Sequence, residues 1–227
     1  MNWIKGKFFI LLLALFTFLG IAPFLGAYPI GRVLLEISLS IVLLSSLYAA
    51  SLTRRTFNIA LVLLIPALLI SWLHYLNISS QLFVLAHIFM LFFLLYTTGV
   101  VLADVLREGE VTVDKIFGAV SGYLLIGLTW AFVFILLEWF MPGSIRTMEA
   151  FKGLFTDDMV QRSDIGKFIY FSFVSMTTLG YGDMVPANPP ARAFAFLEAA
   201  MGQMYLAVLV ARLVGLHIAS TSSKERE

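Results

Sequence analysis

The sequence predicts an all-α integral membrane protein with six transmembrane helices and a short re-entrant segment between the fifth and the sixth. Of its 227 residues, 60% are hydrophobic and 13% are charged, whereas a soluble domain is about half apolar and a quarter charged. The apolar residues also form long blocks that match the ~20 residues a helix needs to cross a bilayer. These two observations exclude a water-soluble globular protein.

Six blocks are long enough to cross, and a seventh is too short. The predicted spans cover residues 7–25, 31–52, 57–76, 82–106, 116–141 and 194–217. The first block follows Lys5 and Lys7, as a signal peptide would, but its run of about 18 residues exceeds the usual ~7–15, so we expect a retained helix. The block at residues 165–179 favours a re-entrant segment, which must be buried in protein or face water.

Charge distribution bears on orientation and on partners. The larger share of the 15 Lys and Arg residues falls on the side of the termini, which favours both termini in the cytoplasm. A net charge of +1 makes no electrostatic case for a nucleic-acid partner. The absence of Cys excludes disulfides, thiol catalysis and cysteine-ligated metals.

The short segment ends in a run of hydroxyl side chains and glycines. The run reads Thr177-Thr178-Leu179-Gly180-Tyr181-Gly182-Asp183. It resembles the selectivity filter of tetrameric potassium channels, Thr-Val-Gly-Tyr-Gly, and the resemblance extends over residues 116–219. It implies two units: a four-helix peripheral module in residues 1–110, and a pore domain in residues 111–227 with outer helix, pore helix, filter, inner helix and short cytoplasmic tail.

The chemistry of cation binding agrees with this resemblance. A dehydrated K⁺ ion needs oxygen ligands in place of its water shell. Gly180 and Gly182 permit left-handed backbone angles, which allow successive carbonyls to face one side. The expected ligands are the carbonyls of Thr178, Leu179, Gly180 and Tyr181 and the Thr178 hydroxyl, with Gly182 and Asp183 completing the filter. One chain supplies a quarter of each ring, so a homotetramer with three identical subunits is expected.

The resemblance also implies residues that support the filter. Tyr170 and Phe171 stand where many relatives carry paired tryptophans, and Thr177 ends the pore helix. We expect the Tyr170 hydroxyl to reach Asp183, although ordinary aromatic packing is an equal alternative. Val174 replaces a carboxylate that pairs with the aspartate in some relatives, so that pairing is absent here.

The last span contains the expected hinge and cavity. Gly202 lies near the hinge glycine of the family, and close helix contact is its alternative role. The same alignment implies that Gln203 and Leu206 line the cavity and that Val210 and Val214 lie nearer the inner gate.

One carboxyl group falls inside the same span. Glu198 lies one turn before Gly202 and is expected either to be protonated or to bond a pore-helix hydroxyl such as that of Ser175 or Thr177. The preferred interpretation is a structural tie between the inner helix and the pore helix, and a modulatory role is the alternative.

The first four spans lack the chemistry of a voltage sensor. Six spans with this filter resemble voltage-gated channels, whose fourth helix carries regularly spaced arginines, yet residues 82–101 contain neither Lys nor Arg. We therefore expect little voltage dependence. Glu36 is a possible modulatory residue, and His74 and His87 are expected to be packing residues more often than proton sensors.

The predicted function is passive, potassium-selective conduction, with K⁺ ions in the filter, membrane lipid around the tetramer and no other cofactor. Two alternatives share the fold: a weakly selective cation channel and a non-conducting accessory subunit. An enzyme is not expected, because the three histidines lie on three different helices and form no catalytic cluster. By resemblance, the expected location is a prokaryotic plasma membrane. No residue pattern indicates a regulatory partner or a gating stimulus.

Overall fold

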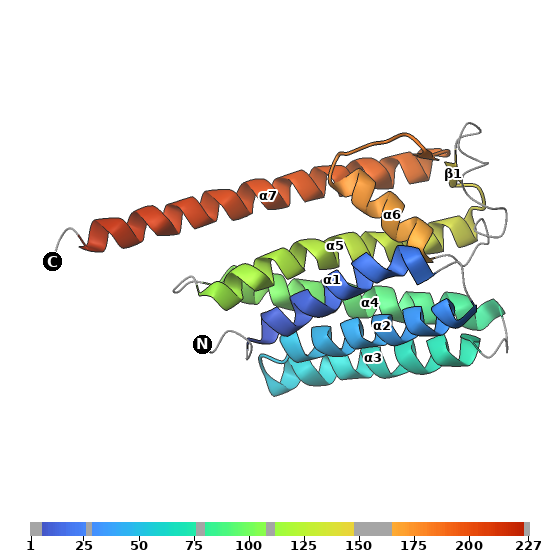
Figure 1. Cartoon of the computed structure of the whole chain (residues 1–227), viewed down its shortest axis with the longest axis horizontal. Coiled ribbons are helices and arrows are strands. Elements are labelled where there is room, and N and C mark those ends of the chain that lie inside the picture. The colour runs from blue at the N-terminus through green and yellow to red at the C-terminus, as the bar shows by residue number, and fades with distance from the viewer. Residues whose placement is uncertain (1–5, 26–28, 76–79, 108–111, 148–164, 225–227) are drawn as a thin grey trace.

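The computed structural model describes residues 6–25, 29–75, 80–107, 112–147 and 165–224. These form seven helices and two short strands; the long helices run roughly along one direction, and the short α6 lies obliquely to them (Figure 1). In chain order the elements are α1 (Lys7–Leu25), α2 (Pro29–Ala49), α3 (Arg54–Tyr75), α4 (Ser80–Val105), α5 (Val113–Phe140), β1 (Ile145–Thr147), α6 (Ile165–Met176), β2 (Met184–Pro186) and α7 (Pro189–Lys224).

Four of these helices are long and apolar enough to cross a membrane. The qualifying stretches are Arg54–Leu73, Leu82–Val105, Val113–Phe140 and Pro189–Arg212. α1 and α2 coincide with the first two predicted spans, but their described apolar stretches, Lys7–Ile21 and Val33–Ala49, are shorter. Six spans therefore remain a prediction, as does the re-entrant position of α6.

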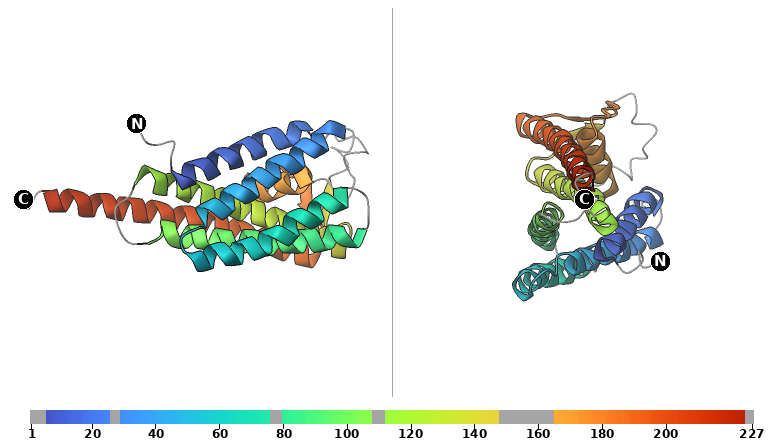
Figure 2. Two further views of the ribbon diagram at one scale, coloured as in Figure 1. Left: turned by 90° about the horizontal axis from the view of Figure 1, so that it is seen from below. Right: turned by 90° about the vertical axis from the view of Figure 1, so that its left-hand side faces the viewer.

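α5 lies at the centre of the fold. It contacts α1 and α4 on one side and α6 and α7 on the other. Of its membrane-length apolar stretch, 72% is buried. α2 and α3 lie farther out, against α1 and α4 (Figure 2). α1 and α4 therefore pack directly on α5, and α2 and α3 pack mainly on α1 and α4.

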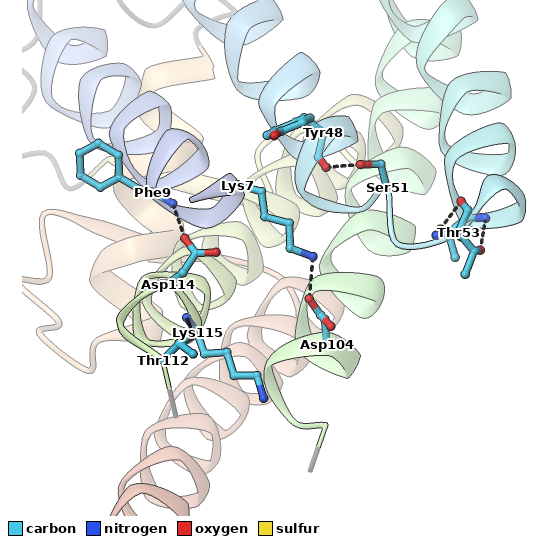
Figure 3. A network of polar contacts seen from close by, with 10 residues as sticks. Lys7, Phe9, Tyr48, Ser51, Thr53, Asp104, Thr112, Asp114 and Lys115 are labelled. Atoms are coloured by element: carbon cyan, nitrogen blue, oxygen red, sulfur yellow. Dashed lines mark hydrogen bonds and ion pairs between the residues drawn. The ribbon is translucent and has the colours of Figure 1, made fainter. Parts of the chain in front are cut away.

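The start of α1, the end of α4 and the C-terminal half of α7 make polar contacts near the start of α5. Lys7 forms an ion pair of 2.7 Å with Asp104, and the Asp114 carboxylate accepts the Phe9 amide at 3.2 Å (Figure 3). From α7, the Arg212 guanidinium donates to the Arg107 carbonyl at 2.7 Å. Figure 1 shows that α1 begins and α7 ends at this end of the bundle, as expected if both termini share one side.

α7 begins five residues before the apolar block that predicted it. Asn188 caps its first turn, because its side-chain oxygen accepts the amide of Ala191 at 2.9 Å. Pro189 and Pro190 then occupy the first helical positions, where a missing N–H costs nothing. Hydropathy alone places the start too late because a capped first turn is not apolar.

A small antiparallel sheet joins β1, which follows α5, to β2, which precedes α7. Ile145, Arg146 and Thr147 of β1 pair with Pro186, Val185 and Met184 of β2. The Ala187 amide extends this contact by donating to the Ser144 carbonyl at 2.8 Å. The sheet fixes the chain that returns from the filter against the segment that follows α5.

Candidate functional site

The filter segment, residues 178–183, begins directly beyond the C-terminal end of α6. Its first amides donate back to carbonyls in the last turn of that helix. These bonds run from Thr178 to Ser175 at 3.0 Å, from Leu179 to Val174 at 3.0 Å and from Gly180 to Val174 at 3.3 Å. In a planar trans peptide the C=O points opposite the N–H. The carbonyls of Thr177, Thr178 and Leu179 therefore all point away from α6.

Along the segment, residues with a left-handed backbone conformation alternate with residues of negative φ. Thr178, Gly180 and Gly182 have φ angles of +59°, +56° and +78°, and the residues between them do not have positive φ. Such alternation turns each peptide plane over relative to an ordinary strand, in which carbonyls face alternate sides. The two glycines adopt the expected left-handed angles, and Thr178 adopts one as well.

Residues 178–182 of the filter segment are exposed in the single chain. The side chains of Leu179 and Tyr181 are 54% and 65% exposed. A Cβ atom added to Gly180 or Gly182 would meet nothing within 4 Å. These glycines are thus required by their φ angles and not by lack of space.

Tyr170 and Asp183 hold the far end of the segment. The Tyr170 hydroxyl donates to the Asp183 carboxylate at 2.6 Å, and the other carboxylate oxygen accepts the Met184 amide at 3.0 Å. Burial, and then the hydrogen bond to Asp183, raise the pKa of Tyr170 to about 12, so the phenol remains a donor at neutral pH. The expected contact is therefore present.

The side chains of Phe171 and Thr177, the other two residues expected to support the filter, contact helices. Phe171 packs edge-on against Phe134 of α5, with ring centroids 4.9 Å apart, and so braces α6 against α5. The Thr177 hydroxyl donates to the Phe173 carbonyl at 2.6 Å and stays within the end of α6.

Gly202 lies against the last residue of α6. A Cβ atom at this position would be 2.6 Å from the Met176 carbonyl oxygen. This geometry supports the alternative role of Gly202, close helix contact.

Glu198 is fully buried and contacts Ser172. The expected contact between this glutamate and a hydroxyl of α6 is present, but its partner is Ser172 and not Ser175 or Thr177, which the sequence suggested. Ser172 lies one turn earlier on α6 than Ser175, and its hydroxyl also lies 2.7 Å from the Gly127 carbonyl of α5. Glu198 thus reaches both α6 and, through Ser172, α5.

The remaining candidates lie on α7 and α2. Gln203, Leu206 and Val210 are exposed on α7, and the side chain of Val214 lies outside the described residues. Glu36 accepts the Ser71 hydroxyl at 2.7 Å and so links α2 to α3.

The structure describes the side chain of His87, one of the two histidines in the first four predicted spans. The Nδ1 atom of His87 lies 2.7 Å from the Phe83 carbonyl, and its ring stacks near Phe83 and Phe132. These contacts favour packing over proton sensing. The side chain of His74 lies outside the described residues. Over the described ranges, no group of His, Asp and Glu side chains is placed to hold a metal ion.

Sequence reasoning missed Glu138. This buried carboxylate accepts the amides of Gly143 at 2.8 Å and Ile145 at 3.0 Å, and so fixes the turn from α5 into β1. A carboxyl group at the end of an apolar helix, followed within five residues by glycine, was the available signal.

Comparison with known proteins gives a family match within the C-terminal half of the chain. Residues 123–217 match the family model described as "Ion channel". The chain is also similar to two pore potassium channel c of Oryza sativa subsp. japonica, with 29% identity over 84 residues. That match spans 37% of this chain and only 18% of the relative. No solved structure matches. The family match supports an ion channel over residues 123–217, and the similarity to this relative supports the resemblance to potassium channels.

Proposed function

Since the pore half matches an ion-channel family and is similar to potassium channels, we propose that this protein forms a potassium-selective pore as a homotetramer. Ions move passively down their electrochemical gradient. The family match points to a channel protein and not to an enzyme.

One observation carries this proposal: consecutive carbonyls beyond α6 face the same way. The amides of Thr178, Leu179 and Gly180 are occupied by α6, which turns the preceding carbonyls away from α6. A row of carbonyl oxygens is the ligand set that replaces the water shell of K⁺. In the proposal, the carbonyls of Gly180 and Tyr181 continue the row and K⁺ is the sole ligand.

The exposure of α7 supports assembly. Only 11% of the apolar stretch of α7 is buried, whereas 72% of the corresponding stretch of α5 is buried. Large apolar side chains such as Phe196 and Met204 are 70% and 67% exposed. In a membrane such apolar side chains face lipid or another protein surface, and in the proposed tetramer neighbouring subunits and lipid together cover α7.

The peripheral module is proposed to sit on its own pore domain and to lack a voltage sensor. α1 and α4 both contact α5 of the same chain, and residues 82–101 carry no cationic side chain. The proposed setting is a plasma membrane with both termini in the cytoplasm, as the distribution of Lys and Arg favours.

Gly180→Ala tests this function directly. The substituted residue must hold a φ of +56°, which costs an L-residue roughly 1–2 kcal/mol and favours realignment of the carbonyls. We expect K⁺ flux into proteoliposomes to lose its preference over Na⁺. Gly20→Ala, in a helix with open space around it, is the matched control and keeps wild-type flux. Unchanged selectivity in Gly180→Ala would refute the filter assignment.

A further inference from the structure

Ser172 lies at the point where three helices of the pore domain meet. Its side chain is fully buried on α6. The hydroxyl oxygen is 2.7 Å from the Gly127 carbonyl of α5 and also within hydrogen-bond distance of the Glu198 carboxyl group of α7. Glu198 is itself fully buried.

The number of protons available for these two hydrogen bonds determines whether Glu198 is protonated. A serine hydroxyl has one proton, and a backbone carbonyl only accepts. If the hydroxyl donated to Glu198, its oxygen would face the Gly127 carbonyl oxygen at 2.7 Å with no proton between them. Both contacts are satisfied only when Ser172 donates to Gly127 and Glu198 donates to Ser172.

The surroundings of Glu198 agree with a neutral group. Its second oxygen, Oε2, has no hydrogen-bond partner among the described residues. From α5, the titratable side chain that interacts with Glu198 is Tyr123, which brings no positive charge. From α6, the facing groups are the uncharged Ser172 and, one turn on, Met176 against Gly202. A carboxylate there would be buried without a counter-charge.

We propose that Glu198 is a protonated carboxylic acid and a positioning residue of the filter. It donates to Ser172, which donates to Gly127, so one directed chain of two hydrogen bonds joins α7, α6 and α5. The contact of Gly202 with Met176 forms a second point of attachment one turn farther along both helices.

This chain of hydrogen bonds acts on the filter through α6. Ser172 lies half a turn before Val174, whose carbonyl receives the amides of Leu179 and Gly180. Loss of the Glu198 proton reverses the Ser172 donor and releases Gly127. Because α6 is then bound less tightly to α5, the carbonyls of the filter segment, which follows α6, lose their alignment.

Infrared difference spectroscopy across alkaline pH tests the protonation without reference to transport. We expect a protonated-carboxyl C=O band that Glu198→Gln removes. Glu138→Gln is the matched control and keeps the band, because Glu138 accepts two amides and is satisfied as a carboxylate. A wild-type spectrum without the band, or a band that survives Glu198→Gln, overturns the assignment.

K⁺ flux as a function of pH tests the positioning role, which rests on the proposed function. We expect wild-type flux to fall at alkaline pH, and Glu198→Gln, whose amide also donates to Ser172, to keep flux without that fall. Glu198→Ala and Ser172→Ala should each lose about tenfold in selective flux, as expected when a buried partner is left unsatisfied.

The outcomes separate the two proposals. If Glu198→Gln is as impaired as Glu198→Ala, or if all variants share the wild-type pH profile, the positioning role is wrong. If the wild type carries the Glu198 band but conducts no K⁺, the proposed function fails while the protonation assignment stands.

Discussion

Thr178 has a left-handed backbone although it is a β-branched residue, for which this conformation is a true outlier. Such a residue costs about 1–3 kcal/mol and persists only where the surroundings impose it. Here the amide is bonded to the Ser175 carbonyl at 3.0 Å and the hydroxyl to the Thr177 carbonyl at 2.6 Å. Hydrogen bonds to the end of α6 thus stabilise the strained conformation of Thr178. This conformation is needed for the carbonyls of the segment to align.

Tyr170 supports the opposite end of the filter, and its removal should weaken the fold locally. Tyr170→Phe deletes the 2.6 Å hydrogen bond to Asp183, a carboxylate that is 9% exposed. A hydrogen bond to a charged group contributes about 1.5–3 kcal/mol. We expect a lower melting temperature for the purified protein and faster loss of K⁺ current during sustained activity.

Tyr48→Phe provides the matched control for this measurement. Tyr48 is 51% exposed on α2, away from the filter, so its substitution should leave both readings unchanged. Equal melting temperatures for Tyr170→Phe and the wild type would show that Asp183 does not depend on the phenol.

At the scale of elements, α6 is held between α5 and α7 by residues that permit close approach. A Cβ atom at Gly127 of α5 would lie 2.8 Å from Phe173 and Met176, and one at Gly202 of α7 would lie 2.6 Å from the Met176 carbonyl. Small residues on both sides therefore let the two long helices clamp the short one. The position of the filter follows from this clamp.

Gly202→Ala distinguishes this clamp from a hinge. Alanine gains about 1 kcal/mol in helix propensity, but overpacking against a backbone carbonyl costs about 1–3 kcal/mol, so we expect net destabilisation of about 1 kcal/mol. Thermal unfolding measures it. Gly99→Ala, with no atom within 4 Å of the new Cβ, should gain stability instead. Stabilisation by Gly202→Ala, together with altered opening, would favour the hinge.

The elements themselves are largely predictable from the sequence, because hydrophobic block length determines the helices. The block at residues 7–25 matches α1, and the short block matches α6 apart from its last turn, where the filter begins. The strands β1 and β2 escaped prediction since three-residue strands leave no periodic pattern. The partner of Glu198 also escaped, because sequence spacing does not determine which turn of α6 faces α7.

At the scale of the whole molecule, one chain leaves the proposed filter segment exposed. The peripheral helices are packed on α5, whereas α7 and the residues 178–182 remain exposed. The central claim is that four copies of this segment close into a row of carbonyl rings. Tetramer formation and selectivity are therefore expected to fail together.

The reversal potential of the purified protein in a planar bilayer tests this claim most directly. K⁺ is placed on one side and Na⁺ on the other, and current is scanned across voltage. We predict reversal near the K⁺ limit, with an open probability that changes little with voltage because residues 82–101 carry no cationic side chain. Reversal near zero would contradict the account, since it would mean that the aligned carbonyls do not select K⁺.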